Sequence, residues 1–406
     1  MMWEIAKLGD ISKNIQTGPF GSQLHQSDYS ECGIPVVMPK DLVGGKISEE
    51  SIARVDKTHV ERLCRHKIEV GDILYSRRGD VGRCAHVTKK EEGWLCGTGC
   101  LRVTIDSEKA DSRFVFFQLQ HPDTVGWVEK HAVGATMLNL NTTILSSVPI
   151  RLPALEIQKR IADILSAYDD LIENNQRQIK LLEEAAQRLY KEWFVDLNFP
   201  GHENTKIVDG VPEGWKYEKV GDLVKTTSGG TPSRRKSEYY VNGNIRWIKT
   251  KELNDGFIFE TEEHITEEAV KNSSAKILPE GTLIVAMYGA TIGKIGIAAA
   301  EMACNQACCA FIAFDNMMSK EYLYCWLMDN REYLISQGKG AAQSNLSQEM
   351  IKKFSILCPG KKIINDFTEF VSVMLENKRV LENKTVMLSK ARDNLLPKLM
   401  SGEVEV

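Results

Sequence analysis

Apolar residues recur through the middle of the chain at steps that alternate between four and three positions. The seam with this spacing consists of Ile157, Ile161, Ile164, Tyr168, Leu171, Asn175, Gln178, Leu182, Ala185 and Leu189. Such alternation is the heptad pattern of a helix that packs against another helix, so it predicts one long helix over residues 153–194. Asn175 and Gln178 interrupt the apolar seam, and a buried polar residue there costs stability but can fix the register of the pairing.

The same pattern returns 206 positions further along the chain. Its members are Ile363, Phe367, Phe370, Met374, Asn377, Leu381, Lys384, Leu388, Ala391 and Leu395. The shift also carries Asn139 onto Asn345 and Pro153 onto Pro359. Register kept over so many positions favours duplication over two unrelated amphipathic helices. Because both seams are apolar, we expect each helix to pair with the other.

Two similar units that pack helix to helix adopt a pseudo-two-fold arrangement, like a dimer built on one chain. A two-fold axis across the seam makes the paired helices antiparallel. Asn377 and Lys384 lie within the second seam. At these two positions we expect the pairing to be looser or bridged by water.

The rest of the chain forms two regions with the same order of predicted elements. A strand over residues 71–76 has its counterpart at 281–286, and a short aromatic helix over 114–119 has its counterpart at 322–327. We expect the aromatic side chains of both helices to lie in the core.

The predicted fold class is therefore α+β, with two similar mixed globular domains separated and followed by long α-helices that pair as an antiparallel coiled coil. We place the globular domains at residues 1–152 and 199–358. The helical spacers are placed at residues 153–198 and 359–406.

The composition is that of a soluble globular protein. Of the 406 residues, 43% are hydrophobic and 26% are charged. No run approaches the roughly 18 apolar residues of a membrane span, and the N-terminus lacks the basic-then-apolar order of a signal peptide. We therefore expect a cytoplasmic protein with no membrane partner.

The ten cysteines are scattered along the chain without a CxxC spacing. This distribution favours reduced thiols over a disulfide framework or a zinc site. Cys304 with Cys308, and Cys84 with His86, are possible metal ligands, but buried core thiols are the favoured interpretation. We expect neither a metal nor a cofactor.

Each predicted strand at 71–76 and 281–286 leads into a glycine-rich segment that ends on a basic residue. These segments, here called the glycine loops, are residues 77–83 (RRGDVGR) and 287–294 (MYGATIGK). Glycines let backbone amides approach a phosphate closely, and the flanking Arg or Lys supplies positive charge. A nucleotide P-loop is excluded, because Gly289 and Gly293 enclose three residues rather than four and Ile295 follows Lys294. A structural hairpin remains the alternative.

The net charge of −4 does not indicate nucleic-acid binding by itself. A whole-chain sum hides local basic patches, however, and one clustered basic face is enough. The candidate DNA-binding residues are Ser22, Lys40, Arg77, Arg78, Arg83 and Thr98 in the first region, and Arg234, Arg235, Lys236, Lys249, Lys251, Tyr288, Thr291, Lys294, Gln343 and Ser344 in the second. The alternative for each residue is that it does not contact DNA and is only a solvated charge or a turn residue.

Four motifs carry a resemblance that covers essentially the whole chain. They are residues 18–22, 158–174 and 185–196, and the especially specific ending 392–403. With the order of two variable globular domains, each followed by a long helix, the chain resembles the specificity subunit of type I restriction-modification systems. The resemblance implies two target recognition domains, each binding one half of a split site on double-stranded DNA. It also implies that the helices set the spacing and dock two methyltransferase subunits, with restriction subunits joining through the complex.

The residues support a non-catalytic role independently of the resemblance. The chain contains no amino-methylation motif, no glycine fingerprint for S-adenosylmethionine, and no HExxH, GxSxG or Walker motif. One alternative is a DNA-processing enzyme with an unrecognised active site, which predicts metal-dependent nicking by the purified chain. Another is a coiled-coil scaffold, which predicts no sequence-dependent DNA affinity.

Overall fold

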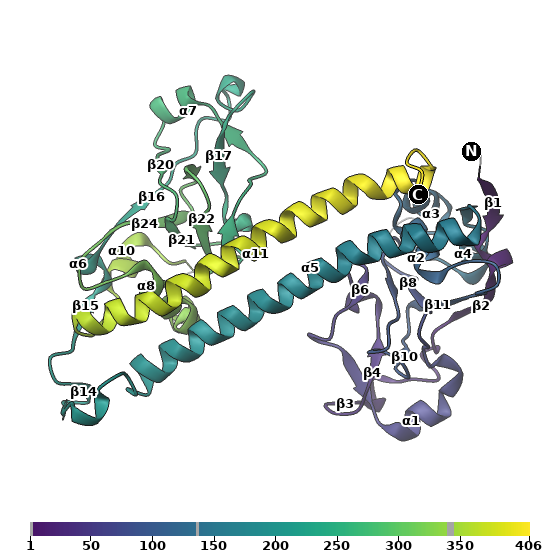
Figure 1. Cartoon of the computed structure of the whole chain (residues 1–406), viewed down its shortest axis with the longest axis horizontal. Coiled ribbons are helices and arrows are strands. Elements are labelled where there is room, and N and C mark those ends of the chain that lie inside the picture. The colour runs from purple at the N-terminus through teal and green to yellow at the C-terminus, as the bar shows by residue number, and fades with distance from the viewer. Residues whose placement is uncertain (1–2, 135–137, 339–344) are drawn as a thin grey trace. The chain divides into compact units, whose positions relative to one another are not determined.

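The protein, represented by a computed structural model, is described for residues 3–134, 138–338 and 345–406. The chain divides into two compact units (Figure 1). The first unit comprises Met1–Leu171 and Leu388–Val406, and the second comprises Ile172–Met387. Each unit therefore combines a globular region with a part of both long helices.

The globular region of the first unit is built on two four-stranded sheets with the orders β2-β11-β8-β9 and β10-β4-β7-β3. Strand β1 pairs with β12, and β5 pairs with β6. The strands are β1 (Glu4–Lys7), β2 (Ser12–Thr17), β3 (Tyr29–Ser30), β4 (Ile34–Val37), β5 (Leu42–Val43), β6 (Lys46–Ile47), β7 (Ala53–Val55), β8 (Ile73–Ser76), β9 (Cys84–His86), β10 (Leu95–Cys96), β11 (Cys100–Ile105) and β12 (Pro149–Leu152). The helices are α1 (Lys57–Arg62), α2 (Ser112–Gln120), α3 (Pro122–His131) and α4 (Thr142–Ser146).

The globular region of the second unit has a five-stranded sheet, β16-β24-β21-β22-β18, and a four-stranded sheet, β19-β17-β23-β20. Strand β15 pairs with β25, and β13 pairs with β14. The strands are β13 (Ile207–Val208), β14 (Val211–Pro212), β15 (Lys216–Lys219), β16 (Val224–Ser228), β17 (Ile245–Ile248), β18 (Gly256–Ile258), β19 (His264–Ile265), β20 (Ile277–Leu278), β21 (Leu283–Ala286), β22 (Ile295–Ala298), β23 (Met302–Cys304), β24 (Cys308–Phe314) and β25 (Ser355–Cys358). The helices are α6 (Val220–Leu223), α7 (Glu267–Lys271), α8 (Lys320–Asp329), α9 (Arg331–Gln337) and α10 (Gln348–Lys353).

The central sheets of the two globular regions share the order of four strands, and the sheet of the second region adds β18 at its edge. In the first, β11 lies between β2 and β8, with Leu101 opposite Tyr75. In the second, β24 lies between β16 and β21, with Cys309 opposite Val285. The common strand order supports the duplication inferred from the sequence, and it gives the two glycine loops the same position after β8 and β21.

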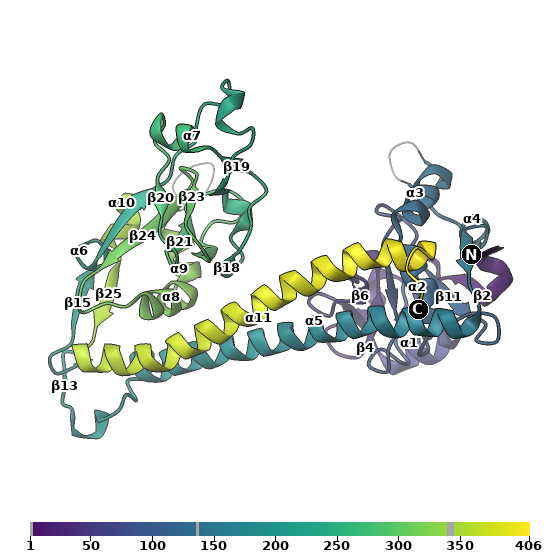
Figure 2. The ribbon, with the colours of Figure 1, turned by 45° about the horizontal axis from the view of Figure 1, so that its top comes forward.

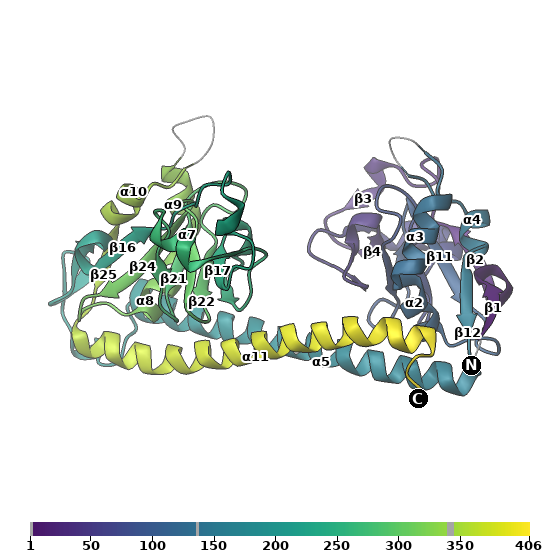
Figure 3. The same cartoon turned by 90° about the horizontal axis from the view of Figure 1, so that it is seen from above.

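Helices α5 (Leu155–Tyr190) and α11 (Lys361–Ser401) are the long helices predicted from the heptad pattern. In the first unit, Ile161 near the start of α5 shares a core with Leu399 near the end of α11. In the second unit, Tyr190 at the end of α5 shares a core with Phe367 near the start of α11, with ring centroids 6.4 Å apart. The helices are therefore antiparallel in each unit, as predicted (Figure 2, Figure 3).

The predicted seam is wrong at some positions. Leu171 is 52% exposed whereas the neighbouring Ile172 is buried, and Phe370 is exposed whereas Val371 is buried. Both helices must cover a globular region as well as each other, and Val371 packs into the core of the globular region in the second unit. This second contact turns the buried face by one position, which a heptad count alone does not predict.

Within the second unit, the pairing of α5 and α11 leaves a cavity of about 510 Å³. Its lining residues are Gln178, Leu181, Leu182, Asn377, Val380, Leu381 and Lys384. Asn377 and Lys384 both line this space, and the looser pairing expected at these two positions stays a prediction.

The other predictions about the core hold as well. The aromatic residues of α2 and α8 are buried, among them Phe114, Tyr322 and Trp326. All ten cysteines are free thiols, and Cys84, Cys304 and Cys308 are buried. Across the described ranges, none of the helices combines the length and apolar character that crossing a membrane requires.

Candidate nucleic-acid interface

Four segments meet at one end of the central sheet in the first unit. The N–H of Arg77, in the glycine loop after β8, donates to the carbonyl of Gly99 at 2.8 Å. The N–H of Leu140 donates to the carbonyl of Arg77 at 2.8 Å. The hydroxyl of Thr98 donates to the carbonyl of Pro19 at 2.9 Å, which brings in the turn after β2. Segments far apart in the sequence are thereby joined into one surface, called here the first loop cluster.

A glycine is required where the turn after β2 meets the loop before β11. A Cβ added to Gly18 would lie 2.0 Å from the carbonyl oxygen of Gly97. In the second unit, a Cβ on Gly229 would lie 1.9 Å from the carbonyl oxygen of Cys304. Both distances are far inside van der Waals contact, so these glycines allow one loop backbone to touch another.

The second unit repeats the arrangement with different residues. The N–H of Met287 donates to the carbonyl of Ala307 at 2.8 Å, and the N–H of Leu346 donates to the carbonyl of Met287 at 2.7 Å. Thr231, in the turn after β16, is hydrogen-bonded to Gln306. These contacts form the second loop cluster, and they place Met287 where the first unit has Arg77.

The next residue of each glycine loop occupies an equivalent position too. Arg78 forms an isolated antiparallel bridge with Asn139, and Tyr288 forms one with Asn345. Side chains directly opposite each other in such a bridge lie on the same face. Each cluster therefore presents an asparagine beside a second side chain, which is Arg78 in one unit and Tyr288 in the other.

The glycine at the tip of each loop has a left-handed backbone. Gly79 has φ 76° and Gly289 has φ 88°, and a Cβ at either position would meet no atom of the described residues within 4 Å. The positive φ explains the residue type, because L-residues with side chains rarely adopt it. The open space leaves both loop tips accessible to a ligand.

The cations of the first cluster differ in how they are held. Arg78 is exposed, and no ion pair or hydrogen bond of its guanidinium is present among the residues that the structure describes. Arg77 is partly buried, and its Nε has no partner within the described ranges. Arg83 is paired with Asp80 at 2.7 Å, and Lys40 donates to the carbonyl of Ser51 at 2.7 Å. Arg77 and Arg78 therefore keep the most donor capacity for a new partner.

Carboxylates hold most of the predicted cations of the second unit. Arg234 lies 2.6 Å from Glu263, and Lys249 lies 2.7 Å from Glu262 and 2.6 Å from Glu263. Lys251 is also paired with Glu262. The hydrogen bonds from Lys249 and Lys251 lower the pKa of Glu262 to about 2, so this carboxylate stays ionised. The basic cluster is thus largely neutralised within the protein.

Aromatic rings complete the surroundings of Arg234. Its guanidinium lies 4.3 Å from the ring centroid of Tyr240 and 5.3 Å from that of Trp247. The Nζ of Lys236 donates a hydrogen bond of 2.9 Å to the hydroxyl of Tyr239. Arg235 is exposed, with no side-chain partner among the described residues.

The remaining predicted residues are distributed around the two clusters. Ser22 is exposed in the turn that continues from Pro19, and Thr291 is partly buried in the second glycine loop. Lys294 at the end of that loop is paired with Asp255 at 2.8 Å. Gln343 and Ser344 lie outside the described residues. Nowhere in the described part of the chain do three or more His, Cys, Asp or Glu residues form a group that could hold a metal ion.

The sequence-based interpretation missed the partners of Lys294. Asp255 accepts hydrogen bonds from both Lys294 and Arg331, and its carbonyl accepts one from the buried Lys378. One signal was present in the sequence, because the 206-residue shift places Lys378 where the first half has Ile172. A lysine in place of a core isoleucine indicates a buried polar contact.

Comparison with known proteins adds four similarities, one to a family model, two to curated relatives and one to a solved structure. A family model described as the type I restriction modification DNA specificity domain matches residues 2–184 and 212–382. The chain is 26% identical to the type I restriction enzyme MjaIX specificity subunit of Methanocaldococcus jannaschii, over 100% of this chain and 94% of the relative. It is 25% identical to the HindI specificity subunit of Haemophilus influenzae, over 99% of each.

A solved S subunit of a type I restriction-modification system from M. genitalium shares the fold, with a TM-score of 0.67 and 16% identity over 98% of this chain and 96% of that one. The family model matches each half of the chain separately, in agreement with the repeated loop clusters and sheets. The chain therefore belongs to the type I restriction-modification DNA specificity family.

Proposed function

We propose that the chain recognises an asymmetric bipartite site on double-stranded DNA, with one half-site contacted by each loop cluster. The observation that carries the proposal is the repeated cluster with different side chains at equivalent positions. Arg77 and Arg78 stand in one cluster where Met287 and Tyr288 stand in the other. An arginine can donate two hydrogen bonds to O6 and N7 of guanine, which neither methionine nor tyrosine can do. The two half-sites should therefore differ in sequence.

The other candidate residues would hold the DNA backbone. Ser22, Lys40, Arg83, Thr98, Arg235, Lys236 and Thr291 offer hydroxyls or cations of the kind that contact phosphates. Arg234, Lys249 and Lys251 would have to exchange Glu262 and Glu263 for phosphate oxygens. Each of these cations would give up a carboxylate when it gains a phosphate, so the exchange contributes little free energy to binding. We therefore expect the isolated chain to bind DNA weakly and the assembled complex to bind it well.

The helices would set the distance between the half-sites. We assign DNA contact to residues 1–152 and 199–358, and spacing to residues 153–198 and 359–406. Helix α5 has 36 residues, which corresponds to a length of about 54 Å. A rigid helix of that length fixes how many base pairs separate two contacts.

The helices also carry exposed apolar residues that suit a docked partner. Leu181 on α5 is 59% exposed and Met387 on α11 is 63% exposed, and the 206-residue shift maps one onto the other. Phe370, Val373 and Val380 are exposed on α11 as well. Apolar positions at this spacing are what another helix would cover. Because Leu181 and Met387 occupy equivalent positions in the two copies of the repeat, we propose two methyltransferase subunits as partners, with restriction subunits joining through the complex.

Methylome sequencing of cells that carry the chain with its methyltransferase tests the proposal. The expected result is one asymmetric motif in two parts, and Arg78→Ala should change only one part while Tyr288→Ala changes only the other. A continuous or palindromic motif would contradict the proposal, and so would a variant that alters both parts together. In this scheme the chain supplies recognition and its partners supply the chemistry.

A further inference from the structure

Lys378 on α11 is a lysine whose side chain is almost completely buried, with 1% exposed. Its Nζ lies 2.6 Å from a carboxylate oxygen of Glu183 on α5 and 3.6 Å from one of Glu382 on α11. The same Nζ donates to the carbonyl of Asp255 at 2.5 Å and to the hydroxyl of Tyr324 on α8 at 3.1 Å. Lys378 thus joins both long helices to the globular region.

Asp255 extends this contact to the second glycine loop. Its carboxylate accepts hydrogen bonds from Lys294 Nζ at 2.8 Å, from Arg331 Nη2 at 2.5 Å and from the N–H of Ile295 at 3.1 Å. Lys294 is the last residue of the loop. A continuous chain of polar contacts therefore runs from the loop through Asp255 and Lys378 to α5.

The charges in this cluster balance. Lys294, Arg331 and Lys378 supply three positive charges, and Asp255, Glu183 and Glu382 supply three negative ones. Burial alone would raise the pKa of Asp255, but Lys294, Arg331 and the N–H of Ile295 outweigh it and the pKa is lowered. Burial likewise disfavours the charged form of Lys378, but Tyr324, Glu382 and Glu183 raise its pKa. Both groups therefore remain charged at neutral pH.

Asp255 holds this place at a conformational cost. Its φ is 72°, in the left-handed region that non-glycine residues avoid. In the first unit the carboxylate of Asp41 accepts a hydrogen bond from the N–H of Met38, as the carboxylate of Glu252 does from the N–H of Lys249 in the second unit. Three positions after this carboxylate the first unit has Gly44, with φ 58°, where the second has Asp255. The repeat also has Ile172 at the position of Lys378. Since the first copy of the fold forms without either charged residue, the fold as such does not require the cluster.

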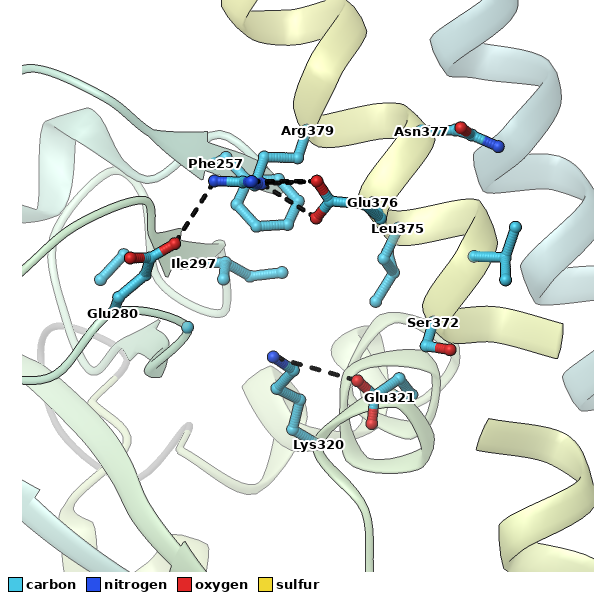
Figure 4. Close-up of a pocket in the computed structure, with 13 residues that line it drawn as sticks. Phe257, Glu280, Ile297, Lys320, Glu321, Ser372, Leu375, Glu376, Asn377 and Arg379 are labelled. Atoms are coloured by element: carbon cyan, nitrogen blue, oxygen red, sulfur yellow. Dashed lines mark hydrogen bonds and ion pairs between the residues drawn. The ribbon is translucent and has the colours of Figure 1, made fainter. Parts of the chain in front are cut away.

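Beside the cluster, the contact between α11 and the globular region of the second unit is interrupted. A cavity of about 660 Å³ lies between α11 and the globular region, lined by Phe257 of β18, Ile297 of β22 and the start of α8 (Figure 4). At its edge, Arg379 of α11 is paired with Glu280 at 3.3 Å. Apolar packing therefore covers only part of the interface between α11 and the globular region. Hydrogen bonds and ion pairs, which have a fixed geometry, then matter more for the orientation of that region on the helix.

We propose that Asp255 and Lys378 are positioning residues that hold the second glycine loop in one orientation on the helix pair, so that the second half-site is bound at a single distance from the first. This inference rests on the proposed function. The polar chain ties the loop to the element that sets the spacing. Loosening it leaves the contacting residues in place but lets the loop shift relative to the helices.

The test uses the full-length chain assembled with its methyltransferase and DNA substrates that carry both half-sites with the native spacer or with one base pair more or less. Asp255→Gly introduces the residue of the first unit and removes the backbone strain, and Lys378→Met keeps the length of the side chain without its charge. Arg177→Gln is the matched control, because Arg177 is an exposed cation of α5 that is paired with Glu173 one turn away on the same helix.

The wild-type complex should methylate the native spacer about ten-fold or more faster than either altered spacer, a discrimination comparable to that against a mismatched base pair. Both positioning variants should reduce this ratio to about three-fold or less, while Arg177→Gln keeps it. The preference at the first half-site should not change in any variant.

A positioning variant with the wild-type spacer ratio would overturn the inference, even if its melting temperature fell, because that is the result of a purely structural role. If Lys378→Met does not assemble, Asp255→Gly still decides the question, since glycine is compatible with this turn. A wild-type complex without any bipartite preference would instead refute the proposed function. The two failures are thereby distinguishable.

Discussion

The guanidinium of Arg392 on α11 donates a hydrogen bond of 2.5 Å to the carboxylate of Asp169 on α5 within the first unit. In the second unit, Lys378 of α11 is paired with Glu183 of α5 at 2.6 Å. Each unit therefore ties the two helices together through a cation of α11 and a carboxylate of α5. Both pairs are at least partly buried, so each should matter more than an ion pair on an open helix surface.

Replacing Arg392 by alanine should destabilise the first unit by about 1–2 kcal/mol, because it leaves the partly buried Asp169 without its partner. Denaturant unfolding of the full chain measures the loss. Arg177→Ala breaks an exposed pair of the i,i+4 type and should cost only about 0.3–0.5 kcal/mol. Equal effects of the two substitutions would show that the link between the helices adds no stability.

Arg78 and Lys294 should affect DNA binding in different ways. Arg78→Ala should cost about 1–3 kcal/mol at one position of one half-site and relax the preference there. Lys294→Ala should weaken binding to all sequences and lower the salt dependence by about one counterion, because the Lys294 side chain is 44% exposed and can attract a phosphate while it stays paired with Asp255. Binding of the assembled complex over a salt series, on matched and mismatched sites, measures both effects. An unchanged salt slope for Lys294→Ala would mean that the charge of Lys294 serves only its pair with Asp255.

The carboxylates of Glu262 and Glu263 should oppose DNA binding at the second basic cluster. Replacing both by glutamine frees Lys249, Lys251 and Arg234 to meet phosphates, so the affinity should rise and the salt dependence should steepen by about one to two counterions. The same salt series tests this expectation, with Glu376→Gln on α11 as the control for a lost surface charge. Unchanged binding would place this basic cluster away from the DNA.

An acidic residue at Met387 should impair docking of the methyltransferase. The side chain is 63% exposed, so Met387→Asp should alter the melting temperature of the isolated chain little. If a partner covers this side chain, burying an unpaired carboxylate should weaken assembly by about ten-fold or more. Size-exclusion chromatography and calorimetric titration measure assembly. Val208→Asp, at an exposed apolar position of β13, is the control, and comparable loss with both variants would argue against a specific site.

The first unit should become less stable on mild acidification. Burial lowers the pKa of His86, and likewise that of His66, to about 4. The unfolded chain therefore takes up protons between about pH 6.5 and pH 4 that the folded unit does not, and the free energy of unfolding falls as the pH falls through this window.

His86→Gln removes one of these protonations and can still hydrogen-bond to Ser112, which lies 3.0 Å from the ring nitrogen. Between pH 7 and pH 5 the free energy of unfolding should therefore fall by about 1–2 kcal/mol less in the variant than in the wild type. Denaturant unfolding at both pH values gives the comparison. An identical pH dependence in wild type and variant would rule out His86 as a contributor.

The sequence by itself determined the secondary structure and the duplication. The heptad spacing from Ile157 onward is a local property of the chain, so it predicted α5, and the 206-residue shift predicted α11. The glycine loops were predictable too, because strand, glycine-rich segment and basic residue follow each other within about a dozen positions. The antiparallel pairing then followed from symmetry.

Only the tertiary structure decided which side chains meet. It turned the buried face of α11 from Phe370 to Val371, because that helix packs on the globular region as well as on α5. It paired Lys294 with Asp255 and Lys249 with Glu262, partners that no local pattern connects. Periodicity specifies which face of an element is apolar, but the residue opposite a charged group comes from another part of the chain and depends on how the elements pack.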